Sequence, residues 1–391
     1  MKYDFDEIID RSSNFSAKVE ESYLHYGTND VIPLWIADMD FKTAQPIIDA
    51  IIDRAKQGIF GYTFRPDEYF NSIADWQIKR NNYKPDTALM AFAPGVVPGM
   101  RFILQMFSAE NDRIMITTPV YHPFTDIVLN TKRTLVNVPL VNEKGLYKMN
   151  FEDIEAEFKK GIKFFIFCNP HNPVGRVWTK EELKTLTSLC LKYRVKIISD
   201  EIHSDLIFSG YKHIPIASIS KEVEKITYTM IAPSKTFNLA GLQASTIIFP
   251  NEEEKNQYVF NLKEMDIARN NCFSLVATIA AYRKGEDWLN QVIEYIHGNM
   301  EFIYEYCKNK IPVLKPNIPE ATYLCWIDAS ALKMNDDALQ QFFVEKAGVA
   351  FSKGSDFGKG GSGFVRLNAA ASRRVIEKAL MQLDAAIKKF L

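Results

Sequence analysis

The chain has 391 residues, of which 47% are hydrophobic and 24% charged, as expected for a globular protein with a substantial core. Its 47 basic and 48 acidic residues give a formal net charge of −1. Composition therefore offers no electrostatic case for binding nucleic acid or a membrane surface.

Three further features narrow the class of protein. The cysteines show no C-x-x-C spacing, so we expect neither disulfides nor structural zinc, and no metal site. Scattered cysteines of this kind favour a reducing cytoplasm. No apolar run approaches the ~18 residues that a membrane span needs, and the acidic start of the chain argues against a signal peptide.

Predicted strands and helices alternate through the middle of the chain. Apolar runs rich in β-branched and aromatic residues predict strands at 113–117, 134–139, 164–168, 195–199, 227–231 and 245–249. Helical spacing occurs at 150–160, 179–193 and 252–267. Thr179 is expected to begin one of these helices in a capping box with the glutamate three residues later. This alternation predicts an α/β fold with a mostly parallel sheet covered on both faces.

The pattern changes after Gly285. Helices are predicted at 286–310, 336–346 and 372–391, with strands at 323–327 and 363–367. These elements indicate a smaller α+β domain, whereas the first 45 or so residues carry little regular pattern. We expect an N-terminal segment (1–48) that packs with the small domain, a large domain (49–285) and a small C-terminal domain (286–391).

Polar clusters follow three of the predicted strands. N-P-H-N-P-V-G (169–175) follows the strand at 164–168, S-D-E-I-H (199–203) ends the next one, and Lys235 lies in A-P-S-K-T-F-N-L-A-G-L after a third. Open α/β sheets place their ligands at the carboxyl ends of strands. An amide, an acid and a lysine in this order suit pyridoxal 5′-phosphate (PLP). This cofactor needs an amine to bind its aldehyde and an acid to keep its ring nitrogen protonated.

These segments together resemble the fold-type-I PLP enzymes, the aspartate aminotransferase superfamily, over nearly the whole chain. W-I-A-D-M-D-F (35–41), P-G-V-V-P (94–98) and D-E-I-H-S-D (200–205) further resemble the branch of MalY/PatB-type cystathionine β-lyases, or C–S lyases. The resemblance implies a large domain with a mostly parallel mixed sheet between helices and a smaller α+β domain. It also implies a homodimer with shared active sites.

The resemblance assigns roles around the cofactor ring. Lys235 would bind the aldehyde and later act as the base that removes the substrate α-proton. Asp200 would pair with the ring nitrogen, and Tyr121 would stack on the ring. Asn172 would hydrogen-bond the phenolic oxygen, although two X-Pro steps leave a purely structural turn open. His203 would lie near the acid, either in a chemical or in a supporting role.

Other residues are implied for the phosphate. Backbone amides of Gly95, Val96 and Val97 precede an amphipathic stretch, and a helix N-terminus suits an anion. Ser234 would add a hydroxyl group. Tyr62 resembles the tyrosine that reaches the phosphate of the neighbouring subunit.

Arg366 resembles the arginine that binds the substrate α-carboxylate as a planar fork. The loop with Ala37 and Asp38 is expected to contact the substrate. Gln243 stands where many aminotransferases of the superfamily carry an arginine eight residues after the lysine, which favours the C–S lyase branch. The glycine-rich stretch 358–363 lacks the P-loop register, so we reject a nucleotide site there.

The leading function is therefore β-elimination from L-cystathionine or related cysteine S-conjugates, giving a thiol, pyruvate and ammonia. Lys235, with Tyr121 as another candidate, would protonate the leaving thiolate. An aminotransferase is the alternative, because the same residues serve both reactions. A third possibility is a regulator or scaffold that has lost catalysis, but no basic helix-turn-helix segment precedes the domain.

Overall fold

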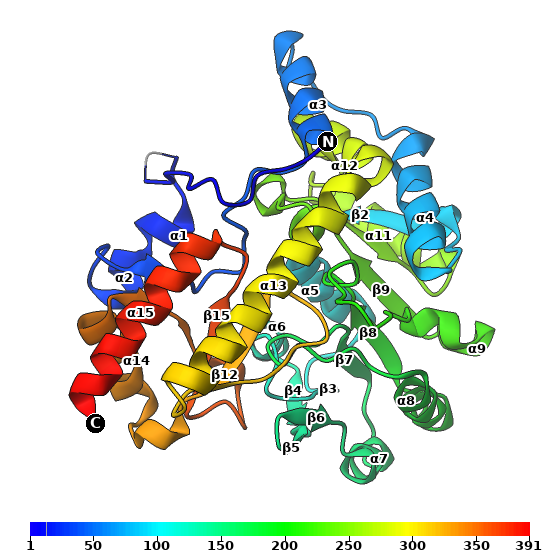
Figure 1. Ribbon diagram of the computed structural model, residues 1–391. Coiled ribbons are helices and arrows are strands. Elements are labelled where there is room, and N and C mark those ends of the chain that lie inside the picture. The colour runs from blue at the N-terminus through cyan, green and yellow to red at the C-terminus, as the bar shows by residue number, and fades with distance from the viewer. Residues whose placement is uncertain (13) are drawn as a thin grey trace.

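The computed structural model describes residues 1–12 and 14–391. Its largest sheet within these ranges has the strand order β2-β10-β9-β8-β7-β3-β4 (Figure 1). Pairs from β9 to β4 are parallel, whereas β10 is antiparallel to β2 and β9. This confirms the predicted mostly parallel mixed sheet, and β2 is a strand that the sequence did not predict. The bounds are β2 Met90–Ala93, β3 Arg113–Ile116, β4 Thr134–Asn137, β7 Phe164–Cys168, β8 Lys196–Asp200, β9 Thr227–Ile231 and β10 Ser245–Ile248.

Helices cover this sheet on both faces. Side chains of β7 alternate: Phe164 and Ile166 pack with α5, α6 and α11, while Phe165 and Phe167 pack with α7 and α8. Because both faces are buried, the strand reads as a continuous apolar run rather than an alternating one. The bounds are α5 Val96–Phe107, α6 Pro123–Asn130, α7 Phe151–Lys159, α8 Lys180–Tyr193 and α11 Glu252–Glu264. The predicted capping box of Thr179 and Glu182 is confirmed at the start of α8.

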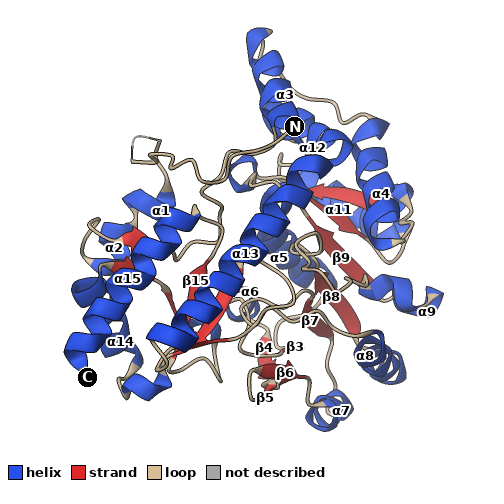
Figure 2. Ribbon diagram, viewed as in Figure 1, coloured by secondary structure: helices blue, strands red, loops and turns tan. Residues whose placement is uncertain are grey.

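A second, antiparallel sheet has the order β11-β12-β15-β14. The long helix α13 runs from α12, beside the large sheet, to α15 and β11 at the small one (Figure 2). One hydrophobic core joins these parts. The bounds are β11 Lys315–Pro316, β12 Leu324–Asp328, β14 Ser352–Lys353, β15 Phe364–Asn368, α12 Cys272–Lys284, α13 Glu286–Lys310, α14 Asp336–Ala347 and α15 Arg373–Phe390.

The N-terminal part of the chain connects the two sheets. Its first residues contact the start of α13, where the Met1 amino group pairs with Asp287 at 2.9 Å. It then crosses to α14 and α15 through the short helices α1 and α2 (Figure 1). β1 pairs in parallel with β13, the short strand that follows α14. The bounds are α1 Ala17–Glu20, α2 Ser22–Tyr26, β1 Ile32–Pro33, β13 Val349–Ala350, α3 Gln45–Lys56 and α4 Asp67–Asn81.

The remaining short elements are β5 Val141–Glu143, β6 Leu146–Lys148, α9 Lys221–Glu224 and α10 Pro233–Thr236. Among the helices of the described residues, none combines the length and apolarity required to span a bilayer.

Candidate active site

The carboxyl ends of β7, β8 and β9 meet at a cavity of about 200 Å³. The predicted site residues that line it are Ala37, Gly95, Val96, Val97, Tyr121, Asn172, Asp200, His203, Ser234 and Lys235. Gln243 also lines the cavity. The parallel strands bring these segments together, because polar residues that follow neighbouring strands lie at one edge of the sheet.

Lys235 lies in α10, the short helix that follows β9. Its Nζ donates a hydrogen bond to the carbonyl oxygen of Ala37 at 2.6 Å. Burial and the charge of Arg366 lower the pKa of Lys235 to about 8, against the opposing charges of Asp38 and Asp200. A substantial share of this amine is therefore unprotonated near neutral pH, as a nucleophile or base requires.

Asp205 is a buried acid that contacts α10, the helix that carries Lys235. The hydroxyl of Thr236, next to Lys235, donates to one oxygen of Asp205 at 2.8 Å, and Trp76 Nε1 donates to the other at 2.8 Å. Burial raises the pKa of Asp205. Asp205 thus links Thr236, the neighbour of Lys235 in α10, to Trp76 of α4.

Asp200 is the last residue of β8 and lies in register with Cys168 and Met230 of the neighbouring strands. One carboxyl oxygen accepts a hydrogen bond from the backbone N–H of Ile202 at 3.1 Å. Burial raises the pKa of Asp200 to about 7, although that hydrogen bond and the charge of Lys235 oppose the rise. A cation placed beside this carboxyl group would favour its charged form.

Arg366 projects from β15 of the four-stranded sheet and is buried. Its two terminal nitrogens donate to Asn172 Oδ1 at 3.2 Å, to the carbonyl oxygen of Trp35 at 3.0 Å and to Ser352 Oγ at 3.0 Å. The guanidinium lies 4.8 Å from the ring centre of Phe357. Burial lowers the pKa of Arg366 to about 10, so it stays charged at neutral pH. Its Nε has no partner among the described residues.

His203 and two tyrosines complete the polar surroundings of the cavity. His203 Nδ1 is buried without a partner in the described part of the chain. Burial, then the charges of Lys235 and Arg366, lower the pKa of His203 to about 3, so its ring is neutral. The ring packs edge-on against Tyr323 at 5.9 Å, and Tyr323 donates its hydroxyl hydrogen to Ala37 O at 2.9 Å. Burial raises the pKa of Tyr121, which therefore stays protonated.

The cavity floor offers an anion site. Helix α5 begins at Val96, directly after Gly95, and the first N–H groups of a helix have no acceptor within that helix. Ser234 lines the same cavity. These groups suit the phosphate of PLP. Together with the amine of Lys235, the acid Asp200 and the unpartnered His203 Nδ1, they fit the expected cofactor.

Three predicted residues are not among those that line the cavity: Arg366, which donates a hydrogen bond to the lining residue Asn172, Tyr62 and Asp38. Tyr62 is 96% exposed, in the connection between α3 and α4. The carboxylate of Asp38 is bound by Arg11 at 2.6 Å, and its pKa is lowered. Burial alone would raise that pKa, but the Arg11 hydrogen bond and the charge of Lys18 outweigh it.

The comparisons with known proteins agree with this geometry. The family model for class I and II aminotransferases matches residues 29–383. Cystathionine β-lyase PatB of Bacillus subtilis (strain 168) is 38% identical over 384 residues, which are 98% of this chain and 99% of PatB.

The chain belongs to the class I and II aminotransferase family. Within it, the predicted cystathionine β-lyase branch is confirmed. A PLP-bound structure from Clostridium difficile 630 is 50% identical with a TM-score of 0.97, covering 99% of this chain and 100% of that one. The PLP-bound C–S lyase from Staphylococcus hominis is 35% identical with a TM-score of 0.93, covering 99% and 98%.

Several residues at or near the candidate active site were not predicted from the sequence. Asn238 lies only three positions after Lys235, so its place in the motif could have indicated a role. Tyr323 and Ser352 reach the site from the four-stranded sheet and its edge, and their local sequence gives no signal. Arg11 and Lys18 lie in the region without regular pattern, where charged residues are ordinarily solvated.

Proposed function

We propose that this protein is a PLP-dependent C–S β-lyase that converts L-cystathionine or related cysteine S-conjugates to a thiol, pyruvate and ammonia. The observation that carries the proposal is that Lys235, Asp200 and Asn172 line one cavity and that Arg366 donates a hydrogen bond to Asn172, in a chain whose relatives include PatB, a cystathionine β-lyase. A buried, charged arginine beside this cavity suits a small amino-acid substrate, because the guanidinium can bind the α-carboxylate.

Each residue has a defined task in this reaction. Bound PLP supplies an electron sink for the negative charge that develops at the substrate Cα. Asp200 would hold the proton on the ring nitrogen of the bound cofactor, and Arg366 would orient the substrate through its α-carboxylate. The unprotonated Nζ of Lys235 takes the α-proton and then delivers a proton to the sulfur of the leaving thiol. Hydrolysis of the three-carbon fragment gives pyruvate and ammonia.

An amino-exchange assay separates this function from the alternative. The C. difficile relative carries a provisional aminotransferase name, and the residues above serve both reactions. We expect pyruvate formation from L-cystathionine to be the same with and without added 2-oxoglutarate. Formation of glutamate from 2-oxoglutarate, together with the 2-oxo acid of cystathionine in place of pyruvate and free thiol, would identify an aminotransferase.

The lowered pKa of Lys235 predicts how the cofactor-free protein takes up PLP. With a pKa of about 8, roughly a quarter of the amine is unprotonated at pH 7.5, against about one in a thousand for an ordinary lysine. The rate of uptake, followed by absorbance, should rise from pH 6 to 8 and level off above about 9. N-α-acetyl-lysine amide serves as the reference amine. A rate that keeps rising to pH 10, as for the reference, would contradict the assignment.

A homodimer with shared active sites is the proposed assembly. Tyr62 lies in a segment with other large exposed apolar side chains: Ile59, Phe60 and Phe64 are 75%, 60% and 82% exposed. Such a patch is typical of a protein interface. In the proposed dimer the Tyr62 hydroxyl reaches the phosphate bound by the partner.

Tyr62→Phe is therefore expected to keep the dimer but to raise the Kd for PLP about tenfold or more, because a hydrogen bond to a charged group is lost. Equilibrium dialysis measures the Kd, and light scattering the mass. Tyr211→Phe, another exposed tyrosine, is the control. Unchanged PLP retention in the Tyr62 variant would remove this residue from the site.

A cytoplasmic location is also proposed. All five cysteines are free and buried. Thiols without disulfide partners are the usual form in a reducing compartment.

A further inference from the structure

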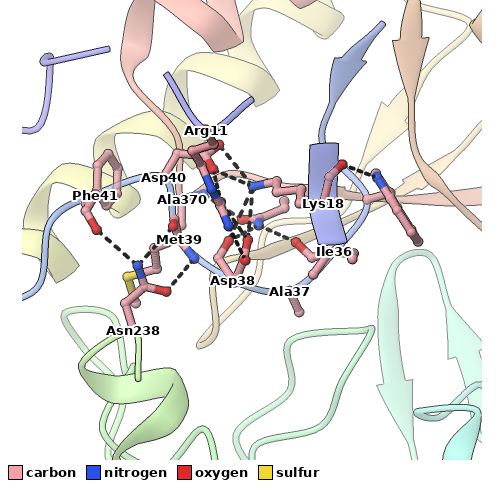
Figure 3. Close-up of polar contacts among 12 residues, drawn as sticks. Arg11, Lys18, Ile36, Ala37, Asp38, Met39, Asp40, Phe41, Asn238 and Ala370 are labelled. Atoms are coloured by element: carbon pink, nitrogen blue, oxygen red, sulfur yellow. Dashed lines mark hydrogen bonds and ion pairs between the residues drawn. The ribbon is translucent and has the colours of Figure 1, made fainter. Parts of the chain in front are cut away.

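A cluster of four charged side chains joins the N-terminal part of the chain to the active-site loop, residues 35–41 (Figure 3). Arg11 contacts Asp38 and Asp40, each at 2.6 Å. Lys18 contacts Asp40 at 2.9 Å and Asp38 at 3.5 Å. Two cations and two anions thus balance each other across two segments that are about 20 residues apart in sequence.

The cluster is largely withdrawn from water. The Lys18 side chain is 0% exposed, and those of Arg11, Asp38 and Asp40 are 18–24% exposed. Loss of one member would leave a buried charge without its partner, which is strongly unfavourable. A second ion pair, Lys42 with Glu7 at 2.6 Å, also joins the N-terminal part to the end of this loop, but its side chains are 60% and 44% exposed. Such a surface pair contributes little.

The same loop is also held by two asparagines that lie close in sequence to Lys235 and Arg366. Asn238, three residues after Lys235, exchanges hydrogen bonds with the backbone N–H and carbonyl of Met39 and donates to Phe41 O, at 2.9–3.0 Å (Figure 3). Asn368, two residues after Arg366, donates to the carbonyl oxygens of Ile36 and Asp38 at 2.7 and 2.5 Å. The loop therefore lies between the segments that carry Lys235 and Arg366.

Two carbonyl groups of this loop are acceptors for those residues. Trp35 O accepts from Arg366 at 3.0 Å, and Ala37 O accepts from Lys235 at 2.6 Å. A shift of the loop would therefore move the acceptors that orient both cations. Misplacement of such groups by about 1 Å is enough to change rates and binding by about a hundredfold.

We infer that Arg11 and Lys18 are positioning residues of the active site. They hold the 35–41 loop in position through Asp38 and Asp40, so that Trp35 O orients Arg366 toward the substrate carboxylate. The inference deepens the proposed function and rests on it. It also changes the expected role of Asp38: its carboxylate is engaged by Arg11 and Lys18, so it acts on the loop rather than on the substrate.

Arg11→Met and Lys18→Met test the inference in PLP-loaded enzyme. Both variants are expected to raise KM for L-cystathionine about tenfold or more with a smaller change in kcat, because orientation of the carboxylate-binding arginine is lost. The dissociation constant of L-alanine, which lacks a leaving group, should rise by the same factor when followed by cofactor absorbance. Lys42→Met, which removes the exposed ion pair, should leave all three quantities unchanged.

Two further measurements keep the test decisive if a variant folds poorly. Arg11→Lys keeps the charge but cannot hold both carboxylates in a fork, so it should give an intermediate rise in the L-alanine constant. Hydrogen exchange of residues 35–41 in the cofactor-free protein should accelerate in Arg11→Lys and Arg11→Met but not in Lys42→Met.

L-Alanine binding and exchange rates that match those of the wild type in the Arg11 and Lys18 variants would overturn the inference. Failure of the wild type to eliminate thiol is a separate outcome. It would overturn the proposed function alone, because L-alanine binding and hydrogen exchange do not require elimination.

Discussion

Lys235→Ala is expected to abolish turnover, with a fall in kcat of about 10³-fold or more. The change removes both the amine that binds the cofactor aldehyde and the base that takes the α-proton. The other groups that fit PLP, among them Asp200, Asn172 and the start of α5, remain in place. The variant should therefore still bind PLP without a covalent link. Steady-state pyruvate release gives kcat, and borohydride reduction followed by peptide mass spectrometry shows whether the cofactor is attached.

Lys225→Ala is the matched control. Lys225 is an exposed lysine just before the amino end of β9, whereas Lys235 follows the carboxyl end of the same strand. The control should retain full activity and covalent cofactor. Turnover by Lys235→Ala near the wild-type rate, or a cofactor still attached after borohydride treatment, would show that another amine does this work.

Arg366→Ala should lower kcat/KM for L-amino acid substrates about 10²–10³-fold, since truncating a buried, hydrogen-bonded charge costs a few kcal/mol. Most of the loss should appear in KM if the arginine binds the carboxylate equally in substrate and transition state. Arg366→Lys keeps the charge but loses the fork, and its effect should be intermediate. Measured kcat and KM for L-cystathionine give these values.

The α-carboxamide of the substrate isolates the role of the charge. Its kcat/KM should fall much less in Arg366→Ala than that of the acid, because the amide offers no negative charge to the guanidinium. Arg374→Gln, at an exposed position beside the start of α15, should behave as wild type. An equal loss for acid and amide would show that Arg366 supports the fold of the site rather than the carboxylate.

Most strands of the large sheet could be predicted, because each is a recognisable apolar run in the sequence. β7 and β9 were predicted with the bounds that the structure shows, since a strand buried on both faces is a continuous apolar run. β2 was missed because Met90–Ala93 contains no β-branched residue, the residue type that most favours a strand. The division into 1–48, 49–285 and 286–391 stays a prediction.

The candidate site likewise contains some residues that the sequence predicts and others that it does not. Asp200 and Lys235 follow strands of one sheet, so their meeting at its edge follows from the order of strands and polar clusters. Tyr323 and Ser352 reach the site only through the packing of the four-stranded sheet against the large one, and no local pattern predicts that. Arg11 and Lys18 matter to the site because they compensate the charges of Asp38 and Asp40. These contacts form only when the chain folds, so the spacing of residues in the sequence does not predict them.

The most direct test of the central claim is to supply PLP-loaded protein with L-cystathionine in the absence of any 2-oxo acid and to follow free thiol and pyruvate together. The proposed function predicts that both are released in equal amounts over many turnovers, and that release stops in Lys235→Ala. No thiol release from the wild type, or release limited to one equivalent per cofactor, would contradict a C–S β-lyase.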